Sequence, residues 1–233
     1  MATRPRQASP ESPPAAISRG TATSIRATAG LIALVAFFAL TLAVVTSSAV
    51  TAFDLSIVMW AETHRAAWAT SLMVWVSRLG GPAIISTYAA LLLVALVLRG
   101  QLPTAVSVAL IVYGGAGLNF AVKHLVHRGR PAGTDPLVHL VTYSYPSGHA
   151  AAATMFGGVL IALLLARARR SAAAVAGAVA LILWICAVCM SRVYLGAHYL
   201  TDVLAGVLEG VAWLVLATMA IERWHLMRSR LLA

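Results

Sequence analysis

His149, His198 and Asp202 are the residues of this sequence best suited to acid, base or nucleophilic chemistry. Imidazole titrates near neutral pH, so one histidine can attack or accept a proton while the other donates one. Asp202 follows His198 by four residues, which places both side chains on one face of a helix. The carboxylate can therefore hold the imidazole of His198 in one tautomer.

Groups that bind anions accompany these histidines. The cations are Lys123, Arg130 and Arg192. Ser147 precedes Gly148 at the expected start of an apolar helix, where serine is a suitable N-cap. The free amides of Ser147 and Gly148 would then face an anion, because the N-terminus of a helix favours negative charge. The sequence therefore predicts an anion-binding pocket that contains two acid or base groups.

Phosphoryl transfer is the chemistry that this pocket suits. Cations and aimed donors stabilise charge on the equatorial oxygens while one group attacks and another protonates the leaving oxygen. A phosphate ester carries up to about two negative charges near neutral pH, and guanidinium groups match them with paired hydrogen bonds. No cluster of carboxylates in the sequence suggests a metal. We therefore expect three fixed cations in place of a metal and no cofactor.

The elements that must position these residues are membrane helices. The chain has 233 residues, of which 61% are hydrophobic and 10% charged, and its mean hydropathy is +0.87. Apolar runs of about 20 residues, the length that spans a bilayer, occur at 29–50, 82–98, 104–123, 148–166, 172–191 and 199–221. The sequence predicts an all-α, polytopic membrane bundle with about six transmembrane helices.

The basic loop residues predict the orientation of this bundle. Alternating helices put on one side Arg4, Arg6, Arg19, Arg26, Arg99, Arg167, Arg169, Arg170, Arg223, Arg228 and Arg230. By the positive-inside rule this side is cytoplasmic. Both termini then lie in the cytoplasm, and the candidate site lies at the extracytoplasmic face of a bacterial plasma membrane.

The chain divides into three expected parts. Residues 1–28, rich in Pro, Ser, Ala and Thr, read as a disordered cytoplasmic tail. Residues 29–222 form the six-helix domain, and 223–233 form a basic cytoplasmic tail. Val50 and Ala52 resemble a signal-peptide cleavage site, but the polar lead and the apolar run are both long for a signal peptide.

Two other classes of binding site are not favoured. The formal net charge of +10 does not indicate a nucleic-acid partner, because the basic residues are not gathered on one solvated surface. Cys186 and Cys189 have the spacing of a redox or zinc pair, but they lie inside an apolar run without nearby histidines. We expect them to belong to the membrane core. The sequence does not indicate an oligomeric state.

At these residues the sequence strongly resembles the type 2 phosphatidic acid phosphatase superfamily, which includes vanadium-dependent haloperoxidases and bacterial acid phosphatases. Three signature elements occur in order. They are Lys123 to Arg130 and Pro131, then Pro146 to His149, and then Ser191, Arg192, His198 and Asp202. The motifs span residues 123–202, and the helix pattern extends the likeness to about 29–221.

The resemblance implies a mechanism and a role for each signature residue. His198 would attack phosphorus to form a phosphohistidine, Asp202 would orient His198, and His149 would protonate the departing group before water releases phosphate. No metal would be required. The residues that the resemblance assigns to phosphate binding are Lys123, Arg130, Ser147, Gly148 and Arg192.

Polar residues outside the signature receive other interpretations. His124, His127, Arg128 and His139 match no signature position. We expect them to be interfacial, with a second phosphate as the alternative partner of His127 or Arg128.

Residues deeper in the helices are expected to be structural. Asn119 and Glu209 are expected to make hydrogen bonds between helices, and Gly206 and Gly210 to pack helices closely. Trp60, Trp68 and Trp75 lie in the long stretch 52–81, which we expect to include an interfacial helix bordering the lipid's route to the site.

The substrate is predicted only as a class. An extracytoplasmic site suits a polyprenyl diphosphate such as undecaprenyl diphosphate, or a phospholipid phosphomonoester such as phosphatidate or phosphatidylglycerol phosphate. A bias to arginine and alanine, with one lysine, suggests a GC-rich bacterium and favours the polyprenyl diphosphate. A lipid phosphotransferase and a non-enzymatic anion or lipid transporter remain alternatives. A haloperoxidase would be soluble and would select vanadate.

Overall fold

Helices are the regular secondary structure of the described part of the chain, and loops connect them. In the computed structural model, residues 19–132, 137–138, 142–167 and 171–231 are described, and these residues contain no strand. The helices are α1 (Arg19–Thr46), α2 (Ser48–Thr63), α3 (Ala67–Leu79), α4 (Pro82–Leu98), α5 (Leu102–Ala109), the π-helical turn η1 (Leu110–Gly114), α6 (Gly115–Val126), α7 (Gly148–Arg167), α8 (Ala172–Tyr194) and α9 (Leu200–Leu231). The predicted all-α fold is confirmed.

The helices supply the predicted membrane spans. Five helical stretches are long and apolar enough to cross a bilayer: Thr23–Thr46, Leu102–Val126, Gly148–Arg167, Ala172–Tyr194 and Leu200–Trp224. A sixth arises if α3 and α4, which meet at a 46° bend, count as one broken span. The bend falls where Pro82 cannot continue the hydrogen-bond ladder of α3. The predicted count of about six spans is confirmed for the described residues.

Both ends of the helical domain lie outside the predicted boundaries. Residues 19–28 were expected in a tail but belong to α1, and α9 continues through most of 223–233. Extending an existing helix adds one hydrogen bond per residue, so polar flanks readily continue it. An ion pair of 2.8 Å between Arg26 and Glu222 joins these two extensions.

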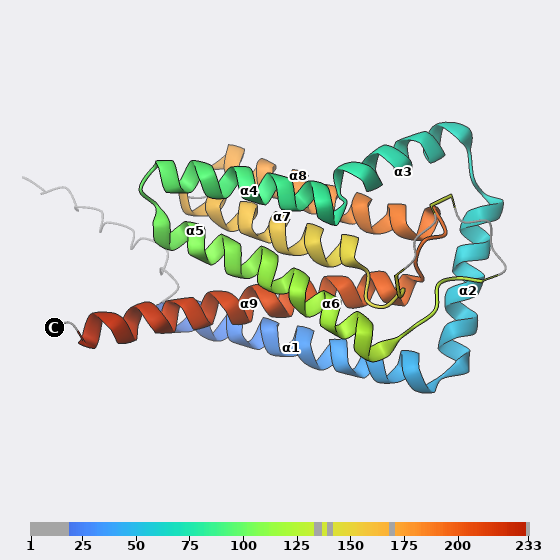
Figure 1. Ribbon diagram of the computed structural model, residues 1–233, viewed down its shortest axis with the longest axis horizontal. Helices are drawn as coiled ribbons and strands as arrows, with labels where there is room; N and C mark the ends of the chain where they lie inside the picture. Colours follow the sequence, from blue (N-terminus) through green and yellow to red (C-terminus); the bar gives the residue numbers. More distant parts are fainter. Residues whose placement is uncertain (1–18, 133–136, 139–141, 168–170, 232–233) are drawn as a thin grey trace, which may run out of the picture.

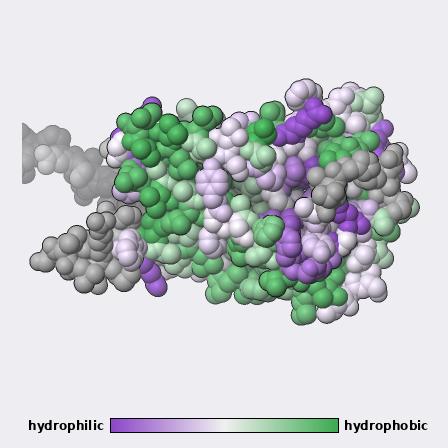
Figure 2. Space-filling view, in the orientation of Figure 1, coloured by the Kyte–Doolittle hydropathy of each residue, from purple (hydrophilic) through white to green (hydrophobic). Residues whose placement is uncertain are grey.

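Most helices run along the long axis of the molecule, and α2 runs across one end of it (Figure 1). α7 packs against α4, α6, α8 and α9, and α1 packs along α9. On the face that Figure 2 shows, hydrophobic side chains cover much of the bundle, whereas hydrophilic ones gather near the end where the loop between α6 and α7 lies. We call this end, where α6 and α8 finish and α7 and α9 begin, the motif end.

The opposite end carries several of the basic residues that predict orientation. The Arg26 side chain pairs with Glu222 of α9 there. Nη2 of Arg167, at the end of α7, donates to Oε1 of Gln101 in the turn after α4 at 3.0 Å. These contacts join α1 to α9, and α7 to the turn after α4, at the end away from the motif end.

The stretch between the first two long spans is helical, as expected. It forms α2 and α3, and it exposes Trp60, Trp68 and Trp75 by 64%, 75% and 60% of their surfaces. Their location at the membrane interface stays a prediction.

Two glycines bring α9 close to α7. A Cβ atom on Gly206 would lie 2.5 Å from the carbonyl oxygen of Ser147, and one on Gly210 would lie 2.8 Å from Cβ of Thr154. Only glycine allows this approach without displacing backbone or a β-branched side chain. The packing role predicted for both glycines is confirmed, and it holds α9 against the start of α7.

Candidate active site

The helix ends bring all three signature elements to the motif end. Lys123 is in the last turn of α6, Arg130 follows in the loop, Ser147 precedes α7, Gly148 and His149 open α7, Arg192 is near the end of α8, His198 lies between α8 and α9, and Asp202 is in the first turn of α9. Direct contacts join several of these residues, including His198 with Arg130 and with Asp202.

His198 is 2% exposed and has a different neighbour at each ring nitrogen. Nδ1 lies 3.4 Å from Oδ2 of Asp202, a separation that is long for a hydrogen bond. Nε2 lies 3.3 Å from Nη1 of Arg130. Burial lowers the pKa of His198 to about 4, although the hydrogen bond with Asp202 opposes this. At neutral pH the ring is therefore neutral, and a proton on Nδ1 leaves the lone pair of Nε2 free.

Asp202 is fully buried and is held by four donors. Oδ2 accepts from Oγ of Ser144 and, at 3.1 Å, from the amide of Tyr199, and it also faces His198. Oδ1 accepts from Nη1 of Arg128 at 2.6 Å. The carboxylate is thereby fixed in orientation, as a group that sets the tautomer of His198 must be.

Arg130 ties the loop after α6 to the turn that carries His198. Nε donates to the carbonyl of Thr142 at 2.8 Å, and Nη1 donates to the carbonyl of Ala197 at 2.6 Å. Burial lowers the pKa of Arg130 from its ordinary value, against the charge of Asp202. The guanidinium still carries its charge at neutral pH, beside the nitrogen of His198 that would attack.

Arg192 is a buried cation with donors to spare. Its side chain is 1% exposed, and Nη1 donates to Oγ of Ser77 in α3. Nε and Nη2 are buried without a hydrogen-bond partner in the described structure. Leaving such donors unpaired is costly, especially for a charged group. An anion in the pocket would satisfy them.

Lys123 makes contacts that the sequence did not suggest. Nζ donates to the carbonyl oxygens of Tyr143, Ser144 and Pro146, at 3.0, 3.4 and 2.6 Å. An ammonium has three protons, and these carbonyls can accept all of them. Lys123 therefore shapes the loop that leads into α7, and its contact with phosphate stays a prediction.

The start of α7 is partly as expected. Oγ of Ser147 accepts from the amide of Ala150 at 3.5 Å, as an N-cap does. The amide of Ser147, however, donates to the carbonyl of Asp202 at 2.9 Å, so the expectation that it points freely at an anion is wrong for this structure. Gly148 is the first helical residue, and its amide is one of those that the helix itself leaves unpaired.

A cavity of about 450 Å³ at the motif end contains His149 and Arg192 in its wall, together with Ser77, Arg78 and Gly81. His149 lies within electrostatic range of Arg192, His198, Arg130 and Lys123. The cavity thus places the second histidine beside two cations, Arg78 and Arg192.

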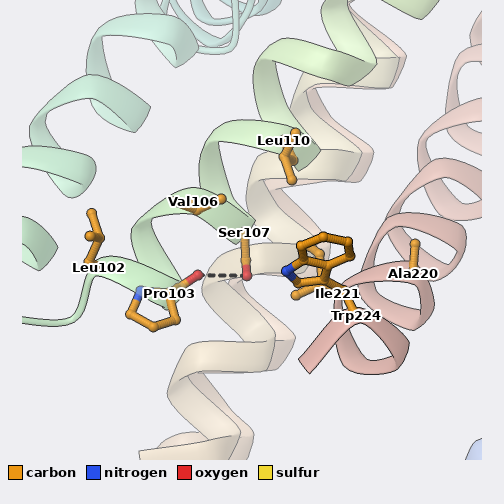
Figure 3. A pocket seen from close by; sticks show the side chains of 8 residues that line it. All are labelled: Leu102, Pro103, Val106, Ser107, Leu110, Ala220, Ile221 and Trp224. Atoms are coloured by element: carbon orange, nitrogen blue, oxygen red, sulfur yellow. Dashed lines mark hydrogen bonds between the residues drawn. The ribbon is translucent and has the colours of Figure 1, made fainter. Parts of the chain in front are cut away.

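Two further cavities differ in character. One of about 250 Å³ runs between α6 and α7, from Lys123 and Gly148 to Phe120 and Met155, and is mainly apolar. The other lies between α5 and α9 at the far end, where apolar residues and Ser107 line it (Figure 3). The second has no titratable side chain in its wall, so it offers nothing for phosphate chemistry.

Of the predictions for the remaining polar residues, one is confirmed and one is wrong. Asn119 donates from Nδ2 to Oε2 of Glu209 at 2.7 Å, which confirms an interhelical hydrogen bond. His124 is exposed beside Phe120, and His127 packs its ring on Tyr143. The expectation that Arg128 is interfacial is wrong, because its side chain is 9% exposed and pairs with Asp54 and Asp202. His139 lies outside the described residues.

Sequence reasoning missed Ser144 and Ser77, since serines without a motif give no signal. The role of Arg128 had one available signal, its closeness to the signature residue Arg130.

In the described part of the chain, no three His, Cys, Asp or Glu side chains are grouped so that they could hold a metal ion. Cys189 is half-buried and Cys186 is exposed on the flank of α8, and both lie inside the candidate membrane span Ala172–Tyr194.

Comparisons with known proteins show the family of the chain. The sequence model of the PAP2 superfamily matches residues 103–225. Phosphatidylglycerophosphatase B of Bacillus subtilis (strain 168) is 30% identical over 187 residues, which cover 75% of this chain and 86% of the relative. The crystal structure of a transmembrane PAP2 type phosphatidylglycerolphosphate phosphatase from Bacillus subtilis superposes with a TM-score of 0.76 and 26% identity, over 83% of this chain and 96% of that one.

Proposed function

Because the chain belongs to the PAP2 superfamily and is a membrane lipid phosphatase like phosphatidylglycerophosphatase B, we propose that His198 is its nucleophile and phosphatidylglycerol phosphate its substrate. The observation that carries this proposal is the environment of His198. Nδ1 faces the fixed carboxylate of Asp202, and Nε2 lies beside Arg130. A neutral imidazole held in this way presents a nucleophilic lone pair to an anion bound by cations.

In the first step, Nε2 of His198 attacks phosphorus and the bond from phosphorus to the leaving oxygen breaks. The proton on Nδ1 stays with His198, where Asp202 stabilises the positive charge that develops on the ring. His149, protonated when the substrate binds, gives this proton to the leaving alcohol and becomes neutral. Arg130 and Arg192 hold the equatorial oxygens, and the two unpaired nitrogens of Arg192 support this role.

In the second step, water attacks the phosphohistidine. The neutral His149 takes a proton from the water as the oxygen–phosphorus bond forms and the nitrogen–phosphorus bond breaks. Phosphate leaves, and His198 returns to its neutral form. The fixed cations stabilise the negative charge on the phosphoryl oxygens in both steps, so we propose that the reaction requires no metal.

The motif-end cavity supports a substrate with a second phosphate. Arg78 lines the same cavity as His149 and Arg192 and is exposed, which leaves its guanidinium available to a further anion. Phosphatidylglycerol phosphate has a phosphodiester near its terminal phosphate, whereas phosphatidate has one phosphate group. The name of the Bacillus relative is in agreement. The apolar cavity between α6 and α7 offers space for part of a lipid tail.

Undecaprenyl diphosphate is the second candidate, since its two linked phosphates also fit this pattern and the arginine and alanine bias of the chain favours a GC-rich bacterium. We propose that the motif end faces the extracytoplasmic side of a bacterial plasma membrane. Arg26, Arg99, Arg167 and Arg223 at the other end then satisfy the positive-inside rule.

Phosphate release from three lipids in parallel tests the substrate. Purified protein in detergent is given phosphatidylglycerol phosphate, undecaprenyl diphosphate and phosphatidate, with and without Arg78→Ala. We expect kcat/KM to be highest for phosphatidylglycerol phosphate, and the substitution to lower it roughly tenfold for the two substrates with a second phosphate, by loss of a charged contact. Equal losses on phosphatidate would contradict a role for Arg78 in reading the second phosphate. Phosphate transfer to an added lipid alcohol without release would favour the phosphotransferase.

A further inference from the structure

A buried charge links the helix that crosses the motif end to the candidate nucleophile. Asp54 in α2 is fully buried, although α2 lies outside the long membrane spans. Its Oδ1 accepts from the amide of Thr201 in the first turn of α9 at 3.1 Å, and its Oδ2 accepts from the hydroxyl of Thr201. Asp54 thus serves α9 as an N-cap does, but from another helix.

Arg128 connects this carboxylate to the one that holds His198. Nη2 donates to Oδ2 of Asp54 at 2.8 Å, and Nη1 donates to Oδ1 of Asp202 at 2.6 Å. The guanidinium also lies over the ring of Tyr199, with 4.1 Å from Cζ to the ring centroid. Burial by itself would lower the pKa of Arg128, but the charge of Asp202 and the bonds to both carboxylates raise it. Arg128 is therefore a permanent cation between two buried anions.

We propose that Arg128 and Asp54 are positioning residues of the phosphatase reaction: Asp54 holds Arg128, and Arg128 fixes Asp202 so that its other oxygen faces His198. The inference rests on the proposed role of His198 as nucleophile. Arg128 touches neither ring nitrogen of His198 in any contact of the described structure, so it acts through Asp202. Through the ion pair of Asp54 with Arg128, α2 becomes part of the candidate site.

The geometry predicts an electrostatic effect as well as a steric one. His198 is flanked by Asp202 of α9, by Arg130 of the loop, by Arg192 of α8 and, at longer range, by His149 of α7. Asp202 favours a charge on His198, and the cations oppose it. The positive charge of Arg128 partly offsets the effect that the negative charge of Asp202 has on the basicity of His198. Removing Arg128 should make His198 more basic, whereas removing the charge of Asp54 should not.

The test compares Arg128→Gln, Arg128→Lys and Asp54→Asn by kcat, KM and the pH profile of kcat/KM on phosphatidylglycerol phosphate or whichever lipid the wild type cleaves. For Arg128→Gln we expect kcat to fall about 10- to 100-fold, by analogy with the loss of groups that orient metal ligands, with KM changed less than about threefold. The acidic limb should move to higher pH by about 0.5 to 1. Arg128→Lys keeps the positive charge, so its acidic limb should lie at the same pH as that of the wild type. The acidic limb of Asp54→Asn should lie at the wild-type pH or lower.

Stability has to be separated from positioning, because removing one partner of a buried ion pair is strongly destabilising. The double variant Asp54→Asn with Arg128→Gln leaves no unpaired carboxylate at position 54, and its folding is checked by gel filtration and thermal melting. It should keep the raised acidic limb. Arg26→Gln, which breaks the half-exposed pair with Glu222 at the other end, is the control and should match the wild type in both kcat and pH profile.

Each outcome bears on the inference. A folded Arg128→Gln or double variant with the wild-type kcat and acidic limb would overturn it, because Arg128 would then only stabilise the fold. Inactivity of His198→Ala alongside that result would keep the proposed nucleophile. Activity of His198→Ala would overturn the proposed function itself, which makes the two failures distinguishable.

Discussion

Nη1 of Arg192, near the end of α8, donates a hydrogen bond to Oγ of Ser77 in α3, and both side chains are buried. Ser77 belongs to α3, which carries no signature residue, and its hydrogen bond orients the guanidinium of Arg192. Nε and Nη2 of Arg192 have no partner in the described structure, so the donors that remain are those available to phosphate. The broken pair of helices α3 and α4 therefore contributes to the candidate site.

Arg192→Lys should lower kcat/KM roughly 100-fold, comparable to the loss of one donor to a developing oxyanion. Lysine keeps the charge but cannot provide a planar, paired set of N–H groups. Ser77→Ala should cost roughly tenfold, in line with one hydrogen bond to a charged group. Phosphate release by folded, detergent-purified variants measures both. A lysine variant as active as the wild type would contradict the binding role of Arg192.

The pH dependence of activity follows from the burial of His198. Because burial lowers the pKa of His198 to about 4, the ring is neutral and nucleophilic well below the pH at which an ordinary histidine is protonated. The acidic limb of kcat/KM should therefore lie below about 6.5, the ordinary value, and the enzyme should keep most of its activity at about pH 5.5. An acidic limb near pH 6.5 that is the same on undecaprenyl diphosphate and phosphatidylglycerol phosphate would contradict the lowered pKa of His198.

The same group makes stability depend on pH. The folded-state pKa of His198 is below its unfolded value, so the unfolded chain takes up a proton first as the pH falls. Stability should decrease as the pH is lowered from about 6.5 to about 4, since the unfolded state binds more protons in that window. Melting temperatures of wild type and His198→Gln across this range measure the effect. The variant should lose less stability, and equal losses would exclude His198 as the cause.

Close packing of α9 on the start of α7 predicts different outcomes for two glycine substitutions. In Gly206→Ala the new Cβ would meet the carbonyl of Ser147 at 2.5 Å, so we expect a loss of about 1–3 kcal/mol from overpacking and lower activity. Gly117→Ala in α6 is the matched control, because a Cβ there has no neighbour within 4 Å. It should be neutral or stabilise by about 0.5–1 kcal/mol. Melting in detergent distinguishes the two.

The hydrogen bond from Asn119 to Glu209 joins α6 and α9 below the site. Asn119→Ala should lower the free energy of unfolding by about 1 kcal/mol or more, since it leaves the buried Glu209 without that donor. A lower melting temperature would measure this loss. Glu209→Gln keeps the shape and can still accept the bond, so its loss should be smaller. A larger loss for Glu209→Gln would mean that the charge of Glu209 itself stabilises the bundle.

The sequence was sufficient for the helices because their apolar runs have the length of a bilayer. The spacing of the signature elements then located the site residues at helix ends. The extent of α1 and α9 was less predictable, because polar flanks such as residues 19–28 carry no apolar pattern and are held by a tertiary contact, the pair of Arg26 with Glu222.

The interior connections of the site were beyond prediction for a different reason. Asp54 and Arg128 lie 74 residues apart, and only the fold reveals that they share a buried ion pair. Lys123 shows the same limit, because its signature position suggests phosphate, whereas loop carbonyls compete for its protons. Residue types and spacing identify which groups can act, but pairing among them depends on how the loops close.

The most direct test of the account is phosphate release by wild type and His198→Ala in the presence of EDTA, with phosphatidylglycerol phosphate and undecaprenyl diphosphate as substrates. The wild type should release phosphate despite the chelator. His198→Ala should lose at least about 1,000-fold in rate, as expected for an essential nucleophile, while it stays folded by gel filtration. Full activity of His198→Ala, or wild-type activity abolished by EDTA and restored by a divalent cation, would contradict it.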